Sequence, residues 1–235
     1  NYNQLQTINI SSPEDDNLSN ETFTVAASAT GIATSNLDVT VVDNDSQSFV
    51  ISSVTSEVQE GSTGTFSVAL AYEPNSDTTV SIASQNVGAV TVSNVSLTFT
   101  PANYSQAQTV TFTANQDQDT ADEQGVIVAI NSPNVTTYEL SLTVNDDDTQ
   151  RLVASPSALT IVEGGVSAQL AITLAFQPSI NETVTFSAPA SLNLSPSTIS
   201  FTPQNYETAQ TLTVSANEDD NLRTETEDLT ATLAS

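Results

Sequence analysis

Short segments of this chain alternate hydrophobic residues with polar or small ones. The clearest run is Thr65–Tyr72, and the same pattern returns at 97–100 and 109–113. Because successive side chains of a strand point to opposite faces, alternation with a period of two predicts strands with one buried face. The residues expected to face that core are Phe66, Val68, Leu70, Tyr72, Val110 and Phe112. No segment shows a clear period of 3.6, so the pattern predicts an all-β fold.

Between residues 46 and 148 the alternation and the turn residues predict seven strands. They are expected at 48–55, 64–72, 78–84, 96–100, 107–114, 124–132 and 137–144. Seven short strands in about 100 residues are typical of an immunoglobulin-like β-sandwich.

The sequence also repeats itself at a fixed spacing. Asn1-Tyr2 recurs as Asn103-Tyr104 and again as Asn205-Tyr206, each time 102 residues further on. A unit of this length can bury its own core, so tandem sandwich modules in an extended string are expected. The predicted division is 1–45 for the C-terminal part of a first repeat, 46–148 for a complete repeat, and 149–235 for a third repeat without its last strand.

The composition narrows the choice of partners. Arg151 and Arg223 are the two basic residues, against 28 acidic ones, and the net charge is -26. Such a charge excludes nucleic acid and anionic membrane surfaces as partners and favours cations. No apolar run approaches the roughly 20 residues of a membrane span, so no membrane insertion is expected in this segment.

No enzyme is expected. Cys, His, Met and Trp are all absent, which removes thiol and imidazole nucleophiles and the usual zinc ligands. A hydrolase using paired carboxylates, such as Asp119 and Glu123, would need a cleft with aromatic walls, and the sequence does not favour one.

Most of the acidic residues fall in three groups, and these are the candidate metal ligands. The first group is Asp15, Asp16, Glu21, Asp43 and Asp45; the second is Glu60, Asp117, Asp119, Asp122, Glu123, Asp146, Asp147 and Asp148; the third is Glu163, Asp219, Asp220, Glu225 and Glu227.

In an up-and-down sandwich, the first and fifth interstrand loops and the end of the last strand share one tip, so each group is expected to converge. Crowded carboxylates repel each other by about 4 kcal/mol per pair at 4 Å and a dielectric near 20, so they take up protons or bind cations. Ca²⁺ accepts six to eight oxygen ligands in loose geometry, which flexible loops supply. The alternative is that Asp-rich loops are solvated turns; the repetition in register favours Ca²⁺.

These residues give the chain a resemblance to the Calx-β repeat family, which occurs in sodium/calcium exchangers and large bacterial surface proteins. The resemblance is carried by Glu60-Gly61 and Glu163-Gly164, by Glu14-Asp15-Asp16-Asn17 leading to Glu21-Thr22-Phe23, by Asp43-Asn44-Asp45 and Asp146-Asp147-Asp148, and by Asp219-Asp220 followed by Glu225 and Glu227. It implies a calcium site at the tip that joins consecutive modules. The middle repeat departs from the pattern at Gln116, Gln118 and Gly125.

The function expected from these features is that of a structural extender or stalk in a secreted, repetitive surface or filament protein, rigidified by Ca²⁺ between modules. Its expected partners are calcium, the neighbouring repeats and further copies of the chain in a filament, and its expected location is extracellular or at the cell surface. The alternative is an adhesin module that binds a host protein or glycan.

Overall fold

Every regular element of the described residues, 3–220 and 223–234 of this computed structural model, is a β-strand. Within those residues no helix is present that could cross a membrane. Asn1 and Tyr2, which open the repeat, and Ser235, which ends the expected third repeat, lie outside the described residues. The prediction of an all-β fold is confirmed.

The chain divides into two compact units. The first comprises 1–115 with 125–143, and the second comprises 116–124 with 144–235. The acidic loop at 116–124 is therefore grouped with the residues that follow the linker at 146–150.

The first unit contains a sandwich of two antiparallel sheets. One sheet has the order β3 (Phe49–Ser52), β5 (Thr63–Leu70), β9 (Gln108–Ala114) and β7 (Val90–Val92); the other has the order β4 (Glu57–Gln59), β11 (Val135–Asn145), β10 (Glu123–Ser132), β6 (Thr78–Ser84) and β8 (Ser96–Phe99). This strand order is that of an immunoglobulin-like fold.

The alternating residues of β5 and β9 form the core, as expected. Phe66, Val68, Val110 and Phe112 are fully buried, and each such side chain contributes about 1.5–3 kcal/mol on burial. The Phe112 ring packs directly on the backbone, because a Cβ at Gly64 would lie 2.3 Å from Phe112 Cζ.

Two of the nine strands in this region were not expected. One is β4: the strand predicted at 48–55 is β3, which ends at Ser52, and β4 follows it in the opposite sheet. Ser53, with a φ of 52°, turns the chain between them. The short β7 is the other, and three residues are too few to show a period.

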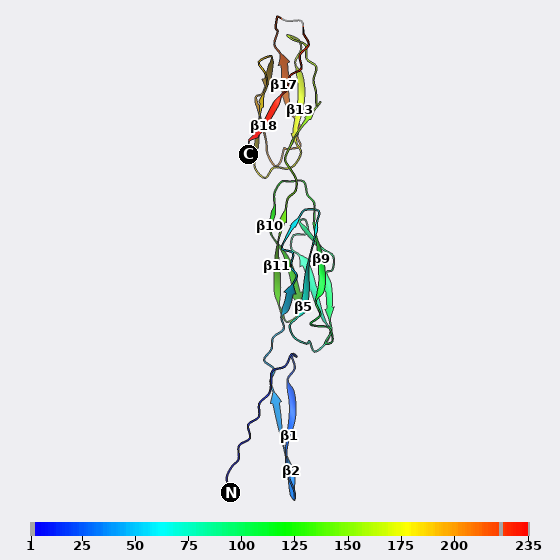
Figure 1. The fold of residues 1–235 in the computed structure, drawn as a ribbon, viewed down its shortest axis with the longest axis vertical. Coiled ribbons are helices and arrows are strands. Elements are labelled where there is room, and N and C mark those ends of the chain that lie inside the picture. Colours follow the sequence, from blue (N-terminus) through cyan, green and yellow to red (C-terminus); the bar gives the residue numbers. More distant parts are fainter. Residues whose placement is uncertain (1–2, 221–222, 235) are drawn as a thin grey trace. The chain divides into compact units, whose positions relative to one another are not determined.

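The first unit also contains a two-stranded hairpin of β1 (Glu21–Ala29) and β2 (Ile32–Val41), seen as neighbouring arrows in Figure 1. Gly31 closes it with a φ of 80°, a conformation that favours glycine. Phe23 pairs with Val39, and Val25 with Leu37.

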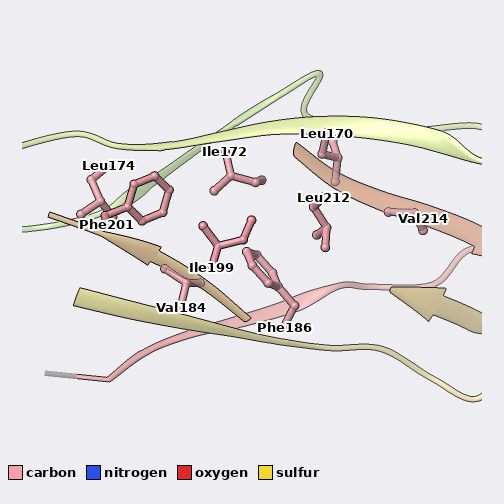
Figure 2. Close-up of a cluster of buried hydrophobic side chains, with 9 residues drawn as sticks. All are labelled: Leu170, Ile172, Leu174, Val184, Phe186, Ile199, Phe201, Leu212 and Val214. Carbon is pink, nitrogen blue, oxygen red and sulfur yellow. The ribbon is translucent and has the colours of Figure 1, made fainter. Parts of the chain in front are cut away.

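The second unit is built from two further sheets. One has the order β12 (Leu152–Ser155), β13 (Ala168–Leu174), β17 (Gln210–Ala216) and β15 (Leu192–Ser195); the other has the order β16 (Thr198–Phe201), β14 (Glu182–Ser187) and β18 (Thr230–Ala234). Figure 2 shows their apolar side chains meeting between the sheets: Leu170, Ile172, Leu174, Val184, Phe186, Ile199, Phe201, Leu212 and Val214.

Strand pairing follows the sequence repeat. Phe66 pairs with Val110 between β5 and β9, and Leu170 pairs with Leu212 between β13 and β17. Equivalent core positions are thus paired in the same way in the two sandwiches.

Candidate cation site

The second acidic loop, residues 116–122 between β9 and β10, is curled by its own carboxylates. The Asp119 N–H donates to Asp117 Oδ1 at 2.9 Å, and the Ala121 N–H donates to Asp119 Oδ1 at 2.7 Å. Such turns are typical of Asp, whose side chain binds backbone amides two residues on. They hold the carboxylates close to one another without any basic residue.

The second linker, residues 146–150 after β11, is hydrogen-bonded to that loop. The Asp146 N–H donates to Asp122 Oδ1 at 2.9 Å, and Gln116 Nε2 donates to Asp147 Oδ1 at 3.0 Å. The Asp148 N–H in turn donates to Asp146 Oδ1 at 2.8 Å. Two segments far apart in the sequence therefore form one acidic surface.

Asp117 lies close enough to three other predicted ligands to share an ion with them. One oxygen each of Asp117, Asp119 and Glu123 lies within 4.8 Å of the others, and Asp117 and Asp146 also place oxygens within 4.8 Å of each other. Because Ca²⁺ binds oxygen at 2.3–2.6 Å, oxygens separated by this distance can contact the same ion.

Several of these carboxylate oxygens have no donor. Glu123 Oε2, Asp146 Oδ2 and Asp148 Oδ2 are buried at the atomic level without a hydrogen-bond partner. A buried charged oxygen without a partner is costly, so the site favours a proton or a cation there.

The same cost is reflected in the acid–base properties of the site. Burial, and then the negative charge of Asp117, raise the pKa of Glu123 from 4.5 to about 7. Burial, and then neighbouring carboxylates, also raise the pKa values of Asp146 and Asp148. These carboxylates therefore bind protons more readily than free carboxylates do.

Glu60, from the same predicted group, belongs to the first unit. It follows β4 and is only 3% exposed. The next residue, Gly61, has a φ of 68°, and its N–H donates to the Ala114 carbonyl at 3.0 Å. The turn thus fixes the backbone beside a buried carboxylate.

The first acidic loop (residues 14–20) and the first linker (residues 43–47) have the same backbone arrangement. Four hydrogen bonds recur at equivalent positions: Asn17 N to Asp15 Oδ1 at 3.0 Å, Ser19 N to Asn17 Oδ1 at 2.7 Å, Asp43 N to Asn20 Oδ1 at 2.7 Å, and Asp45 N to Asp43 Oδ1 at 2.8 Å. Asp15, Glu21, Asp43 and Asp45 line an open hollow of about 320 Å³. Asp16 is exposed.

Both loops also bond to the module that follows. The Asp16 carbonyl accepts from the Glu73 N–H at 2.7 Å, and the Gln118 carbonyl accepts from the Gln177 N–H at 2.8 Å. These contacts were not predicted, because backbone pairing leaves no signal in side-chain patterns.

A glutamine in each linker forms a further clamp. Gln150 Nε2 donates to the Phe176 carbonyl at 2.8 Å, while Gln150 Oε1 accepts from the Phe176 N–H at 3.2 Å. Gln47 binds Tyr72 in the same way, at 2.8 and 3.2 Å. The linkers are therefore tied down by polar contacts where the sequence shows no apolar residue to anchor them.

The carboxylates of the third predicted group lie less close together than those of the second. Burial, and then the charges of Asp219, Glu218 and Glu225, raise the pKa of Glu163. Glu227 accepts a hydrogen bond from the Ser191 hydroxyl at 3.4 Å, and Asp220 is exposed.

Glu218 was not among the predicted ligands. A Cβ on Gly164 would lie 1.9 Å from Glu218 Oε1, so this carboxylate lies against the turn that follows Glu163. The sequence signal that could have identified Glu218 is its position directly before Asp219.

Within the described residues, neither the first nor the third group brings three acidic side chains within 4.8 Å of one another. The second group is therefore the best-formed candidate for a cation.

No family model matches the chain, and no curated protein matches it. Among solved structures, domains 4–9 of the surface layer protein SbsC are similar at 18% identity and a TM-score of 0.36, over 90% of this chain and 33% of that chain. The adhesin InvE of Yersinia pseudotuberculosis is similar at 16% identity and a TM-score of 0.32, over 72% of this chain and 51% of that one. Escherichia coli alpha-2-macroglobulin activated by porcine elastase is similar at 11% identity and a TM-score of 0.27, over 84% of this chain and 22% of that one.

This chain thus spans about a third of the SbsC structure and half of the InvE structure. With identities of 11–18% and TM-scores of 0.27–0.36, no function passes from these proteins to this chain.

Proposed function

We propose that this chain is a non-catalytic structural segment of a repetitive protein of the cell surface or extracellular space, and that Ca²⁺ stiffens a linker between its modules. The observation that carries the proposal is the second acidic site. Its carboxylates come from a loop and a linker. Asp117, Asp119 and Glu123 place oxygens within 4.8 Å of one another, and so do Asp117 and Asp146. Glu123, Asp146 and Asp148 each have a buried oxygen without a donor.

The linker position gives such an ion a mechanical effect. Asp146 and Asp148 stand between the last strand of one sandwich and Leu152, where the next begins. An ion held by these residues together with Asp117 and Glu123 would restrict the direction in which the linker leaves the sandwich. A bound ion would therefore favour one orientation of consecutive modules.

Calcium suits the donor set better than its common competitors. All the candidate ligands are carboxylates, and Cys and His are absent from the chain. Hard oxygen donors on flexible loops favour Ca²⁺ over Zn²⁺, and Mg²⁺ demands a stricter octahedron and releases its water reluctantly. Glu60 stays a predicted ligand of the same acidic group.

An extracellular location would provide enough calcium for such a site. Extracellular calcium modules bind at about 10⁻⁴ to 10⁻³ M, which matches millimolar calcium outside cells. The resemblance to Calx-β repeats supports the same assignment through Glu60-Gly61, Asp146-Asp147-Asp148 and Asp219-Asp220.

Thermal unfolding in calcium and in EGTA tests the proposal. A ligand that binds only the folded state stabilises it by RT ln(1 + [L]/Kd), which is about 0.4–1.4 kcal/mol at a one- to tenfold excess over Kd. Millimolar CaCl₂ should therefore raise the melting temperature by about 2–8 °C, and MgCl₂ at the same concentration should raise it less. Identical melting curves in CaCl₂ and EGTA would reject the site.

A further inference from the structure

The two linkers share a backbone arrangement but differ in the side chains that complete it. In the first acidic loop, Asn17 Nδ2 donates to Glu21 Oε1 at 3.2 Å. The equivalent residues of the second loop are Asp119 and Glu123, which are both carboxylates. An amide thus satisfies Glu21, whereas Glu123 faces another acid and keeps a buried oxygen without a partner.

A second difference lies at the linker itself. The Tyr72 hydroxyl makes a hydrogen bond to the Asp45 carboxylate. Phe176 occupies the equivalent place beside the second linker, where the clamp from Gln150 binds it. Because phenylalanine has no hydroxyl, Asp148 Oδ2 remains buried without a donor.

A third difference lies in the bond between the acidic loop and the following module. The Ser19 hydroxyl donates to Asn75 Oδ1 at 2.6 Å. Ala121 stands at the position of Ser19 in the second loop and has no hydroxyl to donate. Three protein donors of the first linker region are thus missing from the second.

The first acidic loop has Asp15 where the second has Asp117, and its two other acids lie at different positions. Glu14 and Asp16 are exposed, where the second loop has Gln116 and Gln118. Exposed carboxylates are solvated by water and need no fixed partner. Asn17 and Asp119, by contrast, are half-buried. Replacing the amide by a carboxylate at this position therefore removes a donor that water does not simply replace.

We propose that the two linkers are held by different means: hydrogen bonds from Asn17, Ser19 and Tyr72 hold the first without an ion, whereas the second needs a bound divalent cation. The second half of this inference rests on the proposed function. Asn17 and Tyr72 act as positioning residues, and their replacement by Asp119 and Phe176 is what makes the second linker dependent on calcium. Calcium would then change the flexibility of this chain at one linker only.

The absence of cysteine from the chain allows each linker to be measured separately. Cysteines at the exposed positions Ala33 and Ser96 report on the first linker, and cysteines at the equivalent exposed positions Thr136 and Thr198 report on the second. Spin labels on each pair give a distance distribution in CaCl₂ and in EGTA. The first pair should give a narrow distribution in both solutions, and the second pair a narrow one only in CaCl₂.

Exchanging the two donor positions provides matched variants. N17D with Y72F should broaden the first distribution in EGTA and make it respond to CaCl₂. D119N with F176Y should narrow the second distribution in EGTA and lower its calcium affinity by about tenfold or more, the size usual for altered metal-site surroundings.

The outcomes separate this inference from the proposed function. Equal narrowing of both pairs by CaCl₂, or a first pair that is broad in EGTA, would overturn the inference and leave the calcium site standing. If CaCl₂ does not narrow the distance distribution of the second pair, the proposed function is overturned, and the inference with it. The comparison of the two pairs in the otherwise unchanged chain decides the matter even if an exchanged variant does not fold.

Discussion

At the scale of single residues, the chemistry of the second site is set by one carboxylate, Glu123. It is surrounded by Asp117 and Asp119, and it has a buried oxygen without a donor. Its pKa of about 7 means that the calcium-free protein holds a proton there in mildly acidic solution. Protonation and cation binding are thus alternative ways to relieve the same repulsion.

A pH dependence follows for the calcium-free protein. Because the pKa of Glu123 rises from 4.5 to about 7 on folding, the folded state binds the proton more tightly. The stability due to this proton is fully present below pH 4.5 and is lost as the pH rises through about 7. In EGTA, the melting temperature should therefore fall between pH 5 and pH 8, and E123Q should reduce that fall. E139Q, on the exposed side of β11, is the control; an equal reduction by E139Q would mean that general charge repulsion causes the slope.

The ligands of the linker can be tested directly. Replacing Asp146 and Asp148 together by Asn removes two negative charges from the site, and it should lower calcium affinity about tenfold or more in isothermal titration calorimetry. Replacing Asp38 and Asp77, which lie outside the acidic groups, should leave the affinity unchanged. Equal losses from both double variants would show that diffuse charge, and no defined site, attracts calcium.

At the scale of strands and loops, alternation was a sufficient guide to the main strands but not to the connections. Phe66, Val68, Val110 and Phe112 are buried as predicted, because a half-buried strand must alternate. The sequence did not reveal the change of sheet at Ser53 or the three-residue β7, since neither produces a period.

The sequence predicted only part of the candidate site. Acidic residues in register identify the loops and linkers, and the second loop does bring Asp117, Asp119 and Glu123 together. The donors that distinguish the two linkers, such as Tyr72 and the clamp residue Gln150, are neutral and lie outside the acidic runs. Only the folded chain shows which carboxylates they reach.

The glutamine clamp gives a prediction at this scale. Gln150 makes three hydrogen bonds, including one from the Arg151 N–H at 3.1 Å, and Q150A removes all of them. The Phe176 N–H loses its acceptor, so its amide hydrogen exchange, followed by NMR, should accelerate by about tenfold, equivalent to about 1.4 kcal/mol. Q210A, which removes one hydrogen bond to the Ser200 carbonyl, is the control. No change at Phe176 in Q150A would show that the clamp does not hold the linker.

At the scale of the whole molecule, the contacts that fold each module differ from those that connect the modules. Each sandwich has its own apolar core, and the strand pairs of one recur in the other. The linkers contain Asp, Asn, Ser, Thr and Gln but no apolar residue, so polar contacts and ions must set their stiffness. A change in calcium should therefore alter the flexibility of the chain and leave its strands unchanged.

Small-angle X-ray scattering of this chain in CaCl₂ and in EGTA tests the central claim most directly. The account predicts that the distribution of maximum dimensions becomes narrower when calcium is added, while the far-ultraviolet circular dichroism spectrum stays the same. Identical scattering profiles in the two solutions, or collapse into a compact particle on addition of calcium, would contradict the proposed stiffening and would favour a ligand-binding role instead.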